Sequence, residues 1–286
     1  MKNIIILVFT LTIFTLSFGQ SKVEKVTSKI VEEGKKLYKS EMASWYGTDL
    51  FMEKFSDKEN IGGYLSYTEN EISKCIFFSK NENPKVIGTI TFDETFNTKS
   101  AKTELEVREL NKTETELYKI RKSALKTINS DTIFKRYKDT NLNLIPLISN
   151  DEKKVYVLTG PTKNGIIIFG NDYLMKFDKN DNLIERKRLH KNIIWTEFGN
   201  KMPDGQEIIA GSHTHLPETG DFITSTDICT LMLYENAAKW KQYYVYSKNY
   251  MSVWNCENNH LTPISTKVIK KIVKENEKLK REKEQN

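Results

Sequence analysis

The sequence predicts an α+β protein built in two parts, and three features of the chain lead to this prediction. Residues 22–45 repeat their apolar side chains at helical spacing. Short apolar runs rich in β-branched and aromatic residues follow, with Asn- and Glu-rich breaks between them. A polar, irregular stretch at 130–154 then separates a first set of elements from a second. We therefore expect an N-terminal module at 22–150 and a C-terminal domain at 151–286.

The N-terminal module is expected to be a helix followed by an antiparallel meander. The helix carries an apolar stripe that consists of Val23, Val26, Ile30, Leu37 and Tyr38. Three short apolar runs predict strands at 63–67, 74–79 and 85–92. Asn111 and Glu114 have the spacing of a helix cap, so a second helix is expected to start there.

The C-terminal domain is expected to combine short strands with two helices around a central sheet. Apolar β-rich runs predict strands at 155–159, 165–169, 172–177, 193–195 and 207–211. The polar residues 178–182 predict a turn between two of these strands. A helix is expected at 224–241, followed by a hairpin of strands at 242–247 and 250–254 and by a charged helix from Ser265.

The segment 1–20 predicts a secretory signal peptide. Lys2 supplies a short positive region, residues 4–18 form an uncharged apolar run, and small residues at 17–21 suit cleavage. The run is short for a membrane span, and an uncleaved N-terminal anchor helix stays open as an alternative. No later stretch of the sequence is long and apolar enough to span a bilayer. We expect export by the Sec route to the periplasm or the outside of the cell.

The charge balance and the cysteine count exclude several classes of protein. Lys and Arg number 44 against 38 Asp and Glu, and this excess of +6 is spread thinly along the chain. Nucleic-acid binding needs basic residues gathered on one face, so we expect no nucleic-acid partner. The 3 cysteines form at most one disulfide, for which Cys229 and Cys256 are candidates, while Cys75 lies in an apolar run and is expected to be buried.

Two histidines and an aspartate form the most informative pattern in the sequence. His213 and His215 end a predicted strand, and side chains two residues apart on a strand point to the same face. Asp227 lies in the first turn of the next helix, where a loop reversal brings it back toward the histidines. Two imidazoles and one carboxylate, with a fourth position for water, form the usual ligand set of a catalytic zinc site.

Each of these residues also has an interpretation without a metal. The histidine pair can belong to a half-exposed strand face, and Asp227 can close a capping box with Thr224. The other histidines, His190 and His260, have no partner at ligand spacing, so surface or structural roles are expected for them.

The segment from His213 to Asp227 resembles the signature of the JAMM (JAB/MPN) metalloproteases. In that family a His-x-His pair precedes a Ser-x-x-Asp, which here corresponds to His213, His215, Thr224 and Asp227. The resemblance covers about residues 155–256 and implies a JAMM-like mixed α/β domain with a central sheet. It implies that His213, His215 and Asp227 bind Zn²⁺. It further implies that Thr224, or Ser225 if the register shifts by one, stabilises the oxyanion during cleavage of a peptide or isopeptide bond.

The catalytic glutamate of the family has no direct counterpart, because Thr162 stands at the corresponding position. Glu218, in the loop between the histidines and Asp227, is the first candidate for a substitute base, and Asp172 and Glu197 are the others. The leading hypothesis is an exported zinc-dependent hydrolase that acts on an unidentified peptide or protein. The alternatives are an inactive JAMM-like binding or structural domain and an exported α+β protein of another function.

Overall fold

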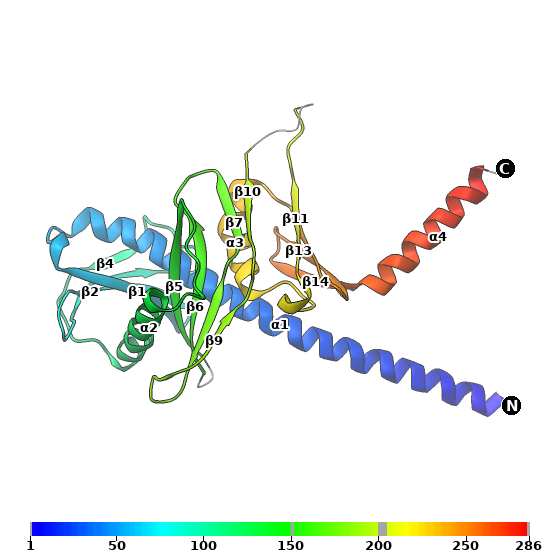
Figure 1. The fold of residues 1–286 in the computed structure, drawn as a ribbon, viewed down its shortest axis with the longest axis horizontal. Helices are drawn as coiled ribbons and strands as arrows, with labels where there is room; N and C mark the ends of the chain where they lie inside the picture. Colours follow the sequence, from blue (N-terminus) through cyan, green and yellow to red (C-terminus); the bar gives the residue numbers. More distant parts are fainter. Residues whose placement is uncertain (1, 150–151, 200–204, 285–286) are drawn as a thin grey trace. The chain divides into compact units, whose positions relative to one another are not determined.

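The computed structural model describes the backbone of residues 2–149, 152–199 and 205–284, and the side chains of residues 22–282 within those ranges. The protein has the α+β class that the sequence predicts (Figure 1). Its contacts divide it into two compact units. Unit 1 comprises Met1–Gly34, Lys201–Ile228 and Glu235–Asn286, and unit 2 comprises Lys35–Asn200 and Cys229–Tyr234. Residues 150 and 151, where the sequence predicts a domain boundary, lie outside the described residues.

The first sheet of unit 2 contains the three-stranded antiparallel meander that the sequence predicts and a fourth strand, at residues 102–104, that was not predicted. Its strands lie side by side in chain order: β1 (Ile61–Glu69), β2 (Ile72–Ser79), β3 (Val86–Phe92) and β4 (Lys102–Glu104). Asn70 and Glu71 both have positive φ and form the tight turn between β1 and β2. The rings of Phe51 and Phe77 stack 3.8 Å apart in the core between this sheet and helix α1.

Helix α1 (Lys2–Lys54) includes the predicted helix at 22–45 and continues beyond it. The part of α1 that belongs to unit 1 ends at Gly34. There Gly34 lies against Ile228, which also belongs to unit 1. A Cβ atom at Gly34 would lie 2.7 Å from Ile228 Cγ2, so only glycine permits this close packing. The signal-peptide prediction concerns residues 1–20, whose side chains are outside the described part of the structure. Among the described residues, no helix is long and apolar enough to span a membrane.

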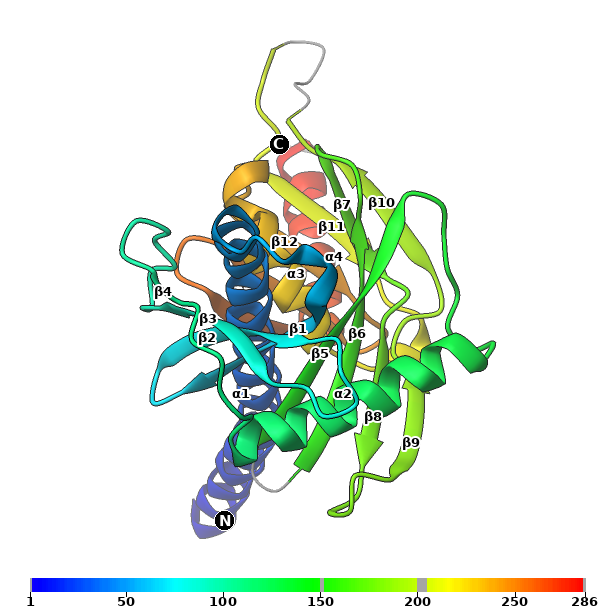
Figure 2. The same cartoon turned by 90° about the vertical axis from the view of Figure 1, so that its left-hand side faces the viewer.

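The second sheet of unit 2 has the strand order β5-β6-β8-β9 and is antiparallel throughout. Its strands are β5 (Thr140–Ser149), β6 (Glu152–Pro161), β8 (Tyr173–Phe177) and β9 (Leu183–Arg188). Helix α2 (Lys112–Ser130) lies across one face of the sheet (Figure 2) and buries Leu117 and Ile120 there. Strands β7 (Ile166–Gly170) and β10 (Ile193–Glu197) form a separate antiparallel pair.

The prediction of an irregular stretch at 130–154 is wrong, because strand β5 occupies ten of those residues. Polar residues and Pro146 interrupt the apolar pattern of β5. Because of these interruptions, the strand was not recognised from the sequence. Pro146 has no N–H to donate, and a proline is tolerated in a strand at the edge of a sheet. β5 is such an edge strand, since it pairs only with β6 in its sheet.

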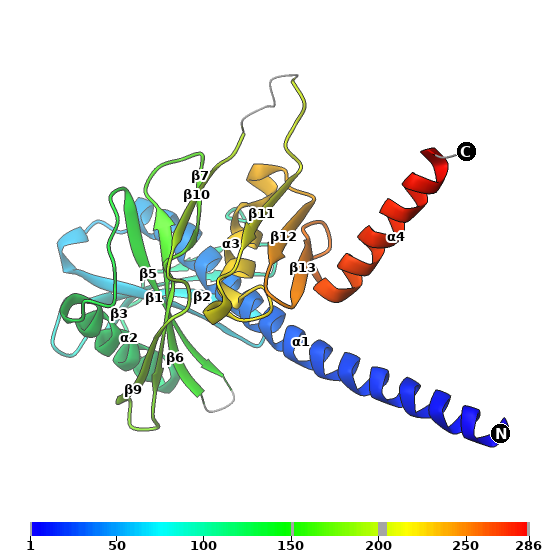
Figure 3. The same ribbon diagram turned by 45° about the vertical axis from the view of Figure 1, so that its right-hand side comes forward.

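The sheet of unit 1 contains both parallel and antiparallel strands in the order β11-β12-β13-β14, and Figure 3 labels the first three of them. These strands are β11 (Ala210–Thr214), β12 (Gln242–Tyr246), β13 (Tyr250–Asn255) and β14 (His260–Ser265). β11 and β12 are parallel, while β12, β13 and β14 form an antiparallel meander. The predicted hairpin at 242–254 is therefore confirmed, whereas β14 was not predicted from the sequence.

Two helices accompany this sheet in the chain. Helix α3 (Ser225–Ala238) follows the short 3₁₀ helix η2 (Pro217–Thr219), and helix α4 (Thr266–Glu284) follows β14 directly. Both α3 and α4 were predicted, with ends within a few residues of those observed. Near the end of α3, Glu235 accepts a hydrogen bond of 3.0 Å from the indole of the buried Trp254.

The cysteines do not form the disulfide that an oxidising compartment would allow. All three thiols are free and buried, and burial raises the pKa of Cys75, Cys229 and Cys256 above that of an exposed thiol. A buried thiol of this kind behaves as a small apolar side chain. The protein therefore relies on packing, as the cysteine count indicates.

Candidate metal site

Strand β11 carries the two histidines of the sequence pattern into the interior of unit 1. The strand begins at Ala210 and not at residue 207, so His213 lies within it and His215 directly after it. The backbone N–H of His215 donates to Tyr246 O at 2.8 Å, which extends the pairing with β12. Both imidazoles are buried, with exposed fractions of 8% and 6%. A half-exposed strand face, the interpretation without a metal, does not describe these histidines.

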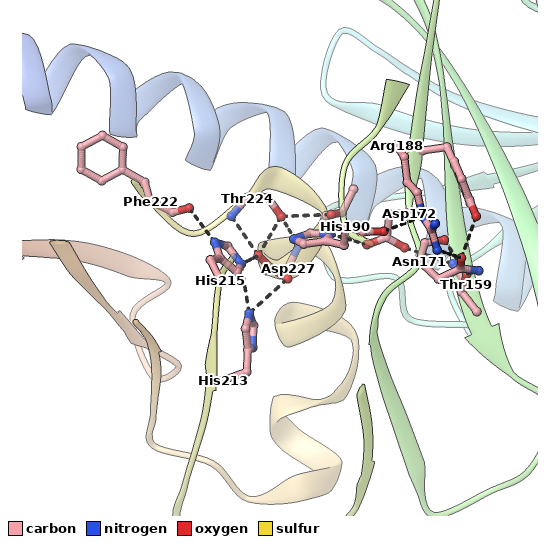
Figure 4. A network of polar contacts seen from close by, with 12 residues as sticks. Thr159, Asn171, Asp172, Arg188, His190, His213, His215, Phe222, Thr224 and Asp227 are labelled. Carbon is pink, nitrogen blue, oxygen red and sulfur yellow. Dashed lines mark hydrogen bonds and ion pairs between the residues drawn. The ribbon is translucent and has the colours of Figure 1, made fainter. Parts of the chain in front are cut away.

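Asp227 closes a capping box at the start of α3. The backbone N–H of Asp227 donates to Thr224 Oγ1 at 3.1 Å, and Asp227 Oδ2 accepts from the N–H of Thr224 at 2.9 Å. The same carboxylate lies beside both histidines (Figure 4). The capping role and the ligand role of Asp227 are therefore compatible, because the cap fixes the carboxylate where the histidines approach it.

The side chains of His213, His215 and Asp227 converge within unit 1. His213 Nε2 and His215 Nε2 are 3.1 Å apart, and His215 Nε2 is 3.1 Å from Asp227 Oδ2. His213 Nε2 is 3.7 Å from Asp227 Oδ1. Zinc with bonds of about 2.0–2.1 Å and tetrahedral geometry requires neighbouring ligand atoms to be roughly 3.3 Å apart. The separations lie close to this value, with the two histidines nearest to different oxygens of the Asp227 carboxylate.

The hydrogen bond between His215 and the Phe222 carbonyl restricts the protonation of the imidazole. His215 Nδ1 lies 3.1 Å from Phe222 O, and a carbonyl oxygen only accepts, so Nδ1 must carry the proton. In the neutral ring, Nε2 then presents a lone pair toward a carboxylate oxygen. Two lone pairs at that distance repel unless a cation lies between them, and the cation is either a metal ion or a second proton on His215. This arrangement is typical of a metal-ligating histidine oriented by a backbone carbonyl.

Tyr243 of β12 supports the other histidine, a role that the sequence did not reveal. Its hydroxyl lies 3.2 Å from His213 Nδ1, and its ring packs against Gly211 of β11. A Cβ atom at Gly211 would lie 2.5 Å from the Tyr243 ring, so the glycine leaves room for it. Burial, and secondarily the charge of Asp227, raises the pKa of Tyr243, so the hydroxyl stays protonated and available to the imidazole.

The hydroxyls expected to stabilise an oxyanion make other contacts in this structure. Thr224 Oγ1 donates to Asp227 Oδ2 at 2.7 Å, and Ser225 Oγ donates to Ile30 O at 3.1 Å. Thr224 therefore orients the candidate ligand Asp227, while Ser225 attaches the start of α3 to α1. The backbone N–H of Ile223 donates to the buried Ser252 Oγ at 3.0 Å, which holds the loop that leads into the helix.

The candidate bases differ widely in their surroundings. Glu218 is exposed in η2 of unit 1, and Glu197 is exposed at the end of β10 in unit 2. Asp172 is buried in unit 2, where it accepts from the N–H of Thr159 at 3.2 Å. Thr162, which the sequence resemblance aligns with the family glutamate, also lies in unit 2 and donates its N–H to Asp139 O. Within unit 1, Glu218 is the exposed acid of the loop that connects the histidines to Asp227.

His190 is a buried residue of unit 2, where it belongs to a polar network (Figure 4). Its Nδ1 lies 3.2 Å from Asp172 Oδ2, and Asn171 of the same network donates to Thr159 Oγ1 at 2.9 Å. The expectation of a surface role is therefore wrong for His190, because the residue is buried and lies within hydrogen-bond distance of Asp172. His260, in contrast, is exposed at the start of β14.

Comparisons of this chain with protein-family models, with curated proteins and with solved structures found no match. The chemistry of the site must therefore be inferred from its own residues. Buried histidine and aspartate side chains of this chain, His215 and Asp227 among them, form a group that could hold a metal ion.

Proposed function

We propose that unit 1 is a zinc-binding domain of JAMM-like organisation and that the protein is an exported zinc-dependent hydrolase. The observation that carries the proposal is the convergence of His213 Nε2, His215 Nε2 and one carboxylate of Asp227 at separations of 3.1–3.7 Å. The order of β11, η2 and α3 along the chain supports the same interpretation. The two histidines lie at the end of β11, and Asp227 lies in the first turn of α3.

The residues of unit 1 fit the chemistry of zinc. Two neutral imidazoles and one carboxylate form the ligand set of catalytic zinc sites that leave a fourth position open. A zinc ion bound there would supply Lewis-acid polarisation of a carbonyl group and would acidify a water molecule. Phe222 fixes the tautomer of His215, and Thr224 holds the carboxylate of Asp227. Ligands oriented in this way lose little conformational entropy when the metal binds.

The proposed reaction is hydrolysis of an amide bond in a peptide or an isopeptide. A hydrolase of this kind needs a group that accepts a proton from water, and Glu218 is the acid of unit 1 best placed in sequence for this role. We propose that Glu218 acts as the base when its loop closes over the site, with Glu197 as the acid to compare. The substrate is an exported peptide or protein of unassigned sequence.

Metal analysis of the purified protein tests the zinc site. We expect about one equivalent of zinc, which a His213→Ala variant loses because it removes one of three protein ligands. His260→Ala is the matched control, because His260 lies exposed in the same unit and should not change the zinc content. Absence of zinc from the unmodified protein under zinc-replete conditions would contradict the proposal.

A non-catalytic zinc-binding domain is the second candidate, and two observations favour it. Thr162 occupies the position of the family glutamate, and the hydroxyl of Thr224 is already donated to Asp227. Amide cleavage by the zinc-loaded protein and by Glu218→Gln and Glu197→Gln variants separates the two candidates. Cleavage that the Glu218→Gln variant loses supports the hydrolase. Zinc binding without cleavage of a diverse peptide library supports the binding domain.

A further inference from the structure

Unit 2 contains a cavity of about 290 Å³, near the lower end of the size range of small-molecule sites. Helix α1 supplies one wall through Glu41, Trp45 and Asp49, which lie four residues apart and therefore on one helix face. The opposite walls include Tyr64 of β1 and Tyr234 of α3. All of these residues belong to unit 2, so the cavity is a feature of one compact body.

Glu41 is the polar centre of the cavity. Its Oε2 accepts one hydrogen bond of 3.1 Å from Asn143 Nδ2 on strand β5. A carboxylate has two oxygens and about four acceptor positions, so this single bond leaves acceptor capacity directed at the cavity. Burial raises the pKa of Glu41 to about 7. The hydrogen bond from Asn143 lowers this pKa, but by less than burial raises it. A positively charged ligand would compensate for this poorly solvated, half-buried carboxylate.

Aromatic side chains surround this carboxylate. The rings of Trp45 and Tyr234 lie 6.4 Å apart at an angle of 50°, and Trp45 is 51% exposed, which places it at the rim. Burial raises the pKa of Tyr234 to about 12 and also raises that of Tyr64, so both phenols stay neutral. The faces of such rings carry negative potential and attract cations, while the phenol oxygens accept hydrogen bonds.

The charge balance of the lining favours a cation over other ligands. Glu41 and Asp49 are acidic, and none of the described residues that line the cavity is lysine or arginine. Arg121 lies outside the lining, with its guanidinium 5.5 Å from the centre of the Tyr64 ring. Its position shows that one face of Tyr64 already holds a cation. An anionic ligand would meet two carboxylates without a compensating base.

We propose that this cavity binds the primary ammonium group of a small organic amine, with Glu41 as its counter-ion and Trp45 and Tyr234 against its alkyl part. A primary ammonium has three donors, and the carboxylates and phenol oxygens of the lining are the acceptors that suit it. The free amine and the side chain of a lysine residue share this group, so the ligand is defined by its ammonium and a short alkyl chain. The site is separate from the proposed zinc function, which concerns residues of unit 1.

Binding of n-butylammonium, followed by calorimetry and by the change in tryptophan fluorescence, tests this site. We expect saturable binding of n-butylammonium and at least tenfold weaker binding of 1-butanol, which has a similar chain without the charge. A Glu41→Gln variant should weaken n-butylammonium binding at least tenfold, because it removes the counter-ion and keeps the shape. Glu53→Gln, an exposed position on the same helix, is the matched control and should bind as the unmodified protein does.

A second probe identifies the source of the amine. Nα-acetyl-lysine amide presents the same ammonium group on a blocked amino acid, so tighter binding than that of n-butylammonium indicates a peptide lysine as the natural ligand. Weaker binding indicates a free amine. The proposal is overturned if neither amine saturates the site, if 1-butanol binds as well as the amine, or if Glu41→Gln and Glu53→Gln behave alike. A Trp45→Leu variant that folds normally should lose the fluorescence change and weaken binding.

Discussion

The carbonyl of Phe222 determines what His215 can do, because it occupies Nδ1 and leaves Nε2 for Asp227. The sequence pattern singles out His213, His215 and Asp227, because the spacing of two on a strand and a helix cap are local features. It was not sufficient to find Tyr243 or Phe222. Their roles depend on the parallel register of β11 with β12 and on the path of a loop, and both arise from long-range contacts.

Replacement of Tyr243 by phenylalanine tests its role beside His213. The variant keeps the ring that packs on Gly211 and removes the hydroxyl that contacts His213 Nδ1. We expect about a tenfold loss of zinc affinity, the lower end of the effect of removing an outer hydrogen-bond partner of a ligand, with little change in folding. Competition with a chelator measures it. Tyr246→Phe, at an exposed position of the same strand, should leave the affinity unchanged.

Glu41 also makes the stability of unit 2 depend on pH. Its pKa is about 7 in the folded protein against 4.5 for an unperturbed glutamate, so the folded state holds the proton more tightly than the unfolded state between these values. The contribution of Glu41 to stability therefore falls as pH rises from about 4.5 through 7. The neighbours Tyr64, Tyr234 and Cys229 have raised pKa values and stay neutral over this range.

A Glu41→Gln variant removes this penalty. At pH 8 we expect it to stabilise the protein by about 3 kcal/mol, from a shift of roughly 2.5 pKa units at about 1.36 kcal/mol each. At pH 4.5 the gain should be close to zero, because Glu41 is protonated in the folded protein. Urea unfolding at both pH values measures the difference. A gain of equal size at the two pH values would show that Glu41 is not the titrating group.

At the level of elements, the patterns with strong local signals were predicted well. The capping box of α2 is an example. Asn111 Oδ1 accepts from the N–H of Glu114 at 2.8 Å, and Glu114 Oε2 accepts from the N–H of Asn111. The structure adds that Glu114 is fully buried and pairs with Arg108 through two hydrogen bonds. The strands β4, β5 and β14 were missed because their pairing partners, and not their own periodicity, define them.

Loss of the α2 cap should destabilise unit 2 measurably. We expect Asn111→Ala to lower the free energy of unfolding by about 1 kcal/mol, because the N–H of Glu114 loses its acceptor. Chemical denaturation measures this change, with Lys112→Ala at the next, exposed position as the control. Equal stability of the two variants would argue against the cap as a stabilising element.

At the level of the whole molecule, the sequence predicts the α+β class but does not predict which chain segments belong to the same compact unit. Unit 1 combines residues from both ends of the chain, and unit 2 includes most of the residues between them together with Cys229–Tyr234. Such grouping depends on contacts between distant segments, and a local pattern of apolar residues contains no information about them. The cysteine count did predict that the fold would rest mainly on packing, and the one disulfide that it left open, between Cys229 and Cys256, is not formed.

The proposed export is a property of the whole chain and is tested on the mature protein. We expect its first residue to lie near Gln20 or Ser21, because small residues there suit cleavage of the predicted signal peptide. Mass spectrometry of the protein recovered from an expressing cell measures the mature N-terminus. An intact Met1 on the exported protein would favour the uncleaved anchor.

X-ray absorption spectroscopy of the zinc-loaded protein tests the central claim most directly, since it reports the atoms bound to the metal. The proposed site predicts a shell of nitrogen and oxygen at about 2.0–2.1 Å with the scattering signature of two imidazoles. That signature should weaken in the His213→Ala variant. A shell with sulfur at about 2.3 Å, or one without imidazole, would contradict the assignment of His213, His215 and Asp227 as the zinc ligands.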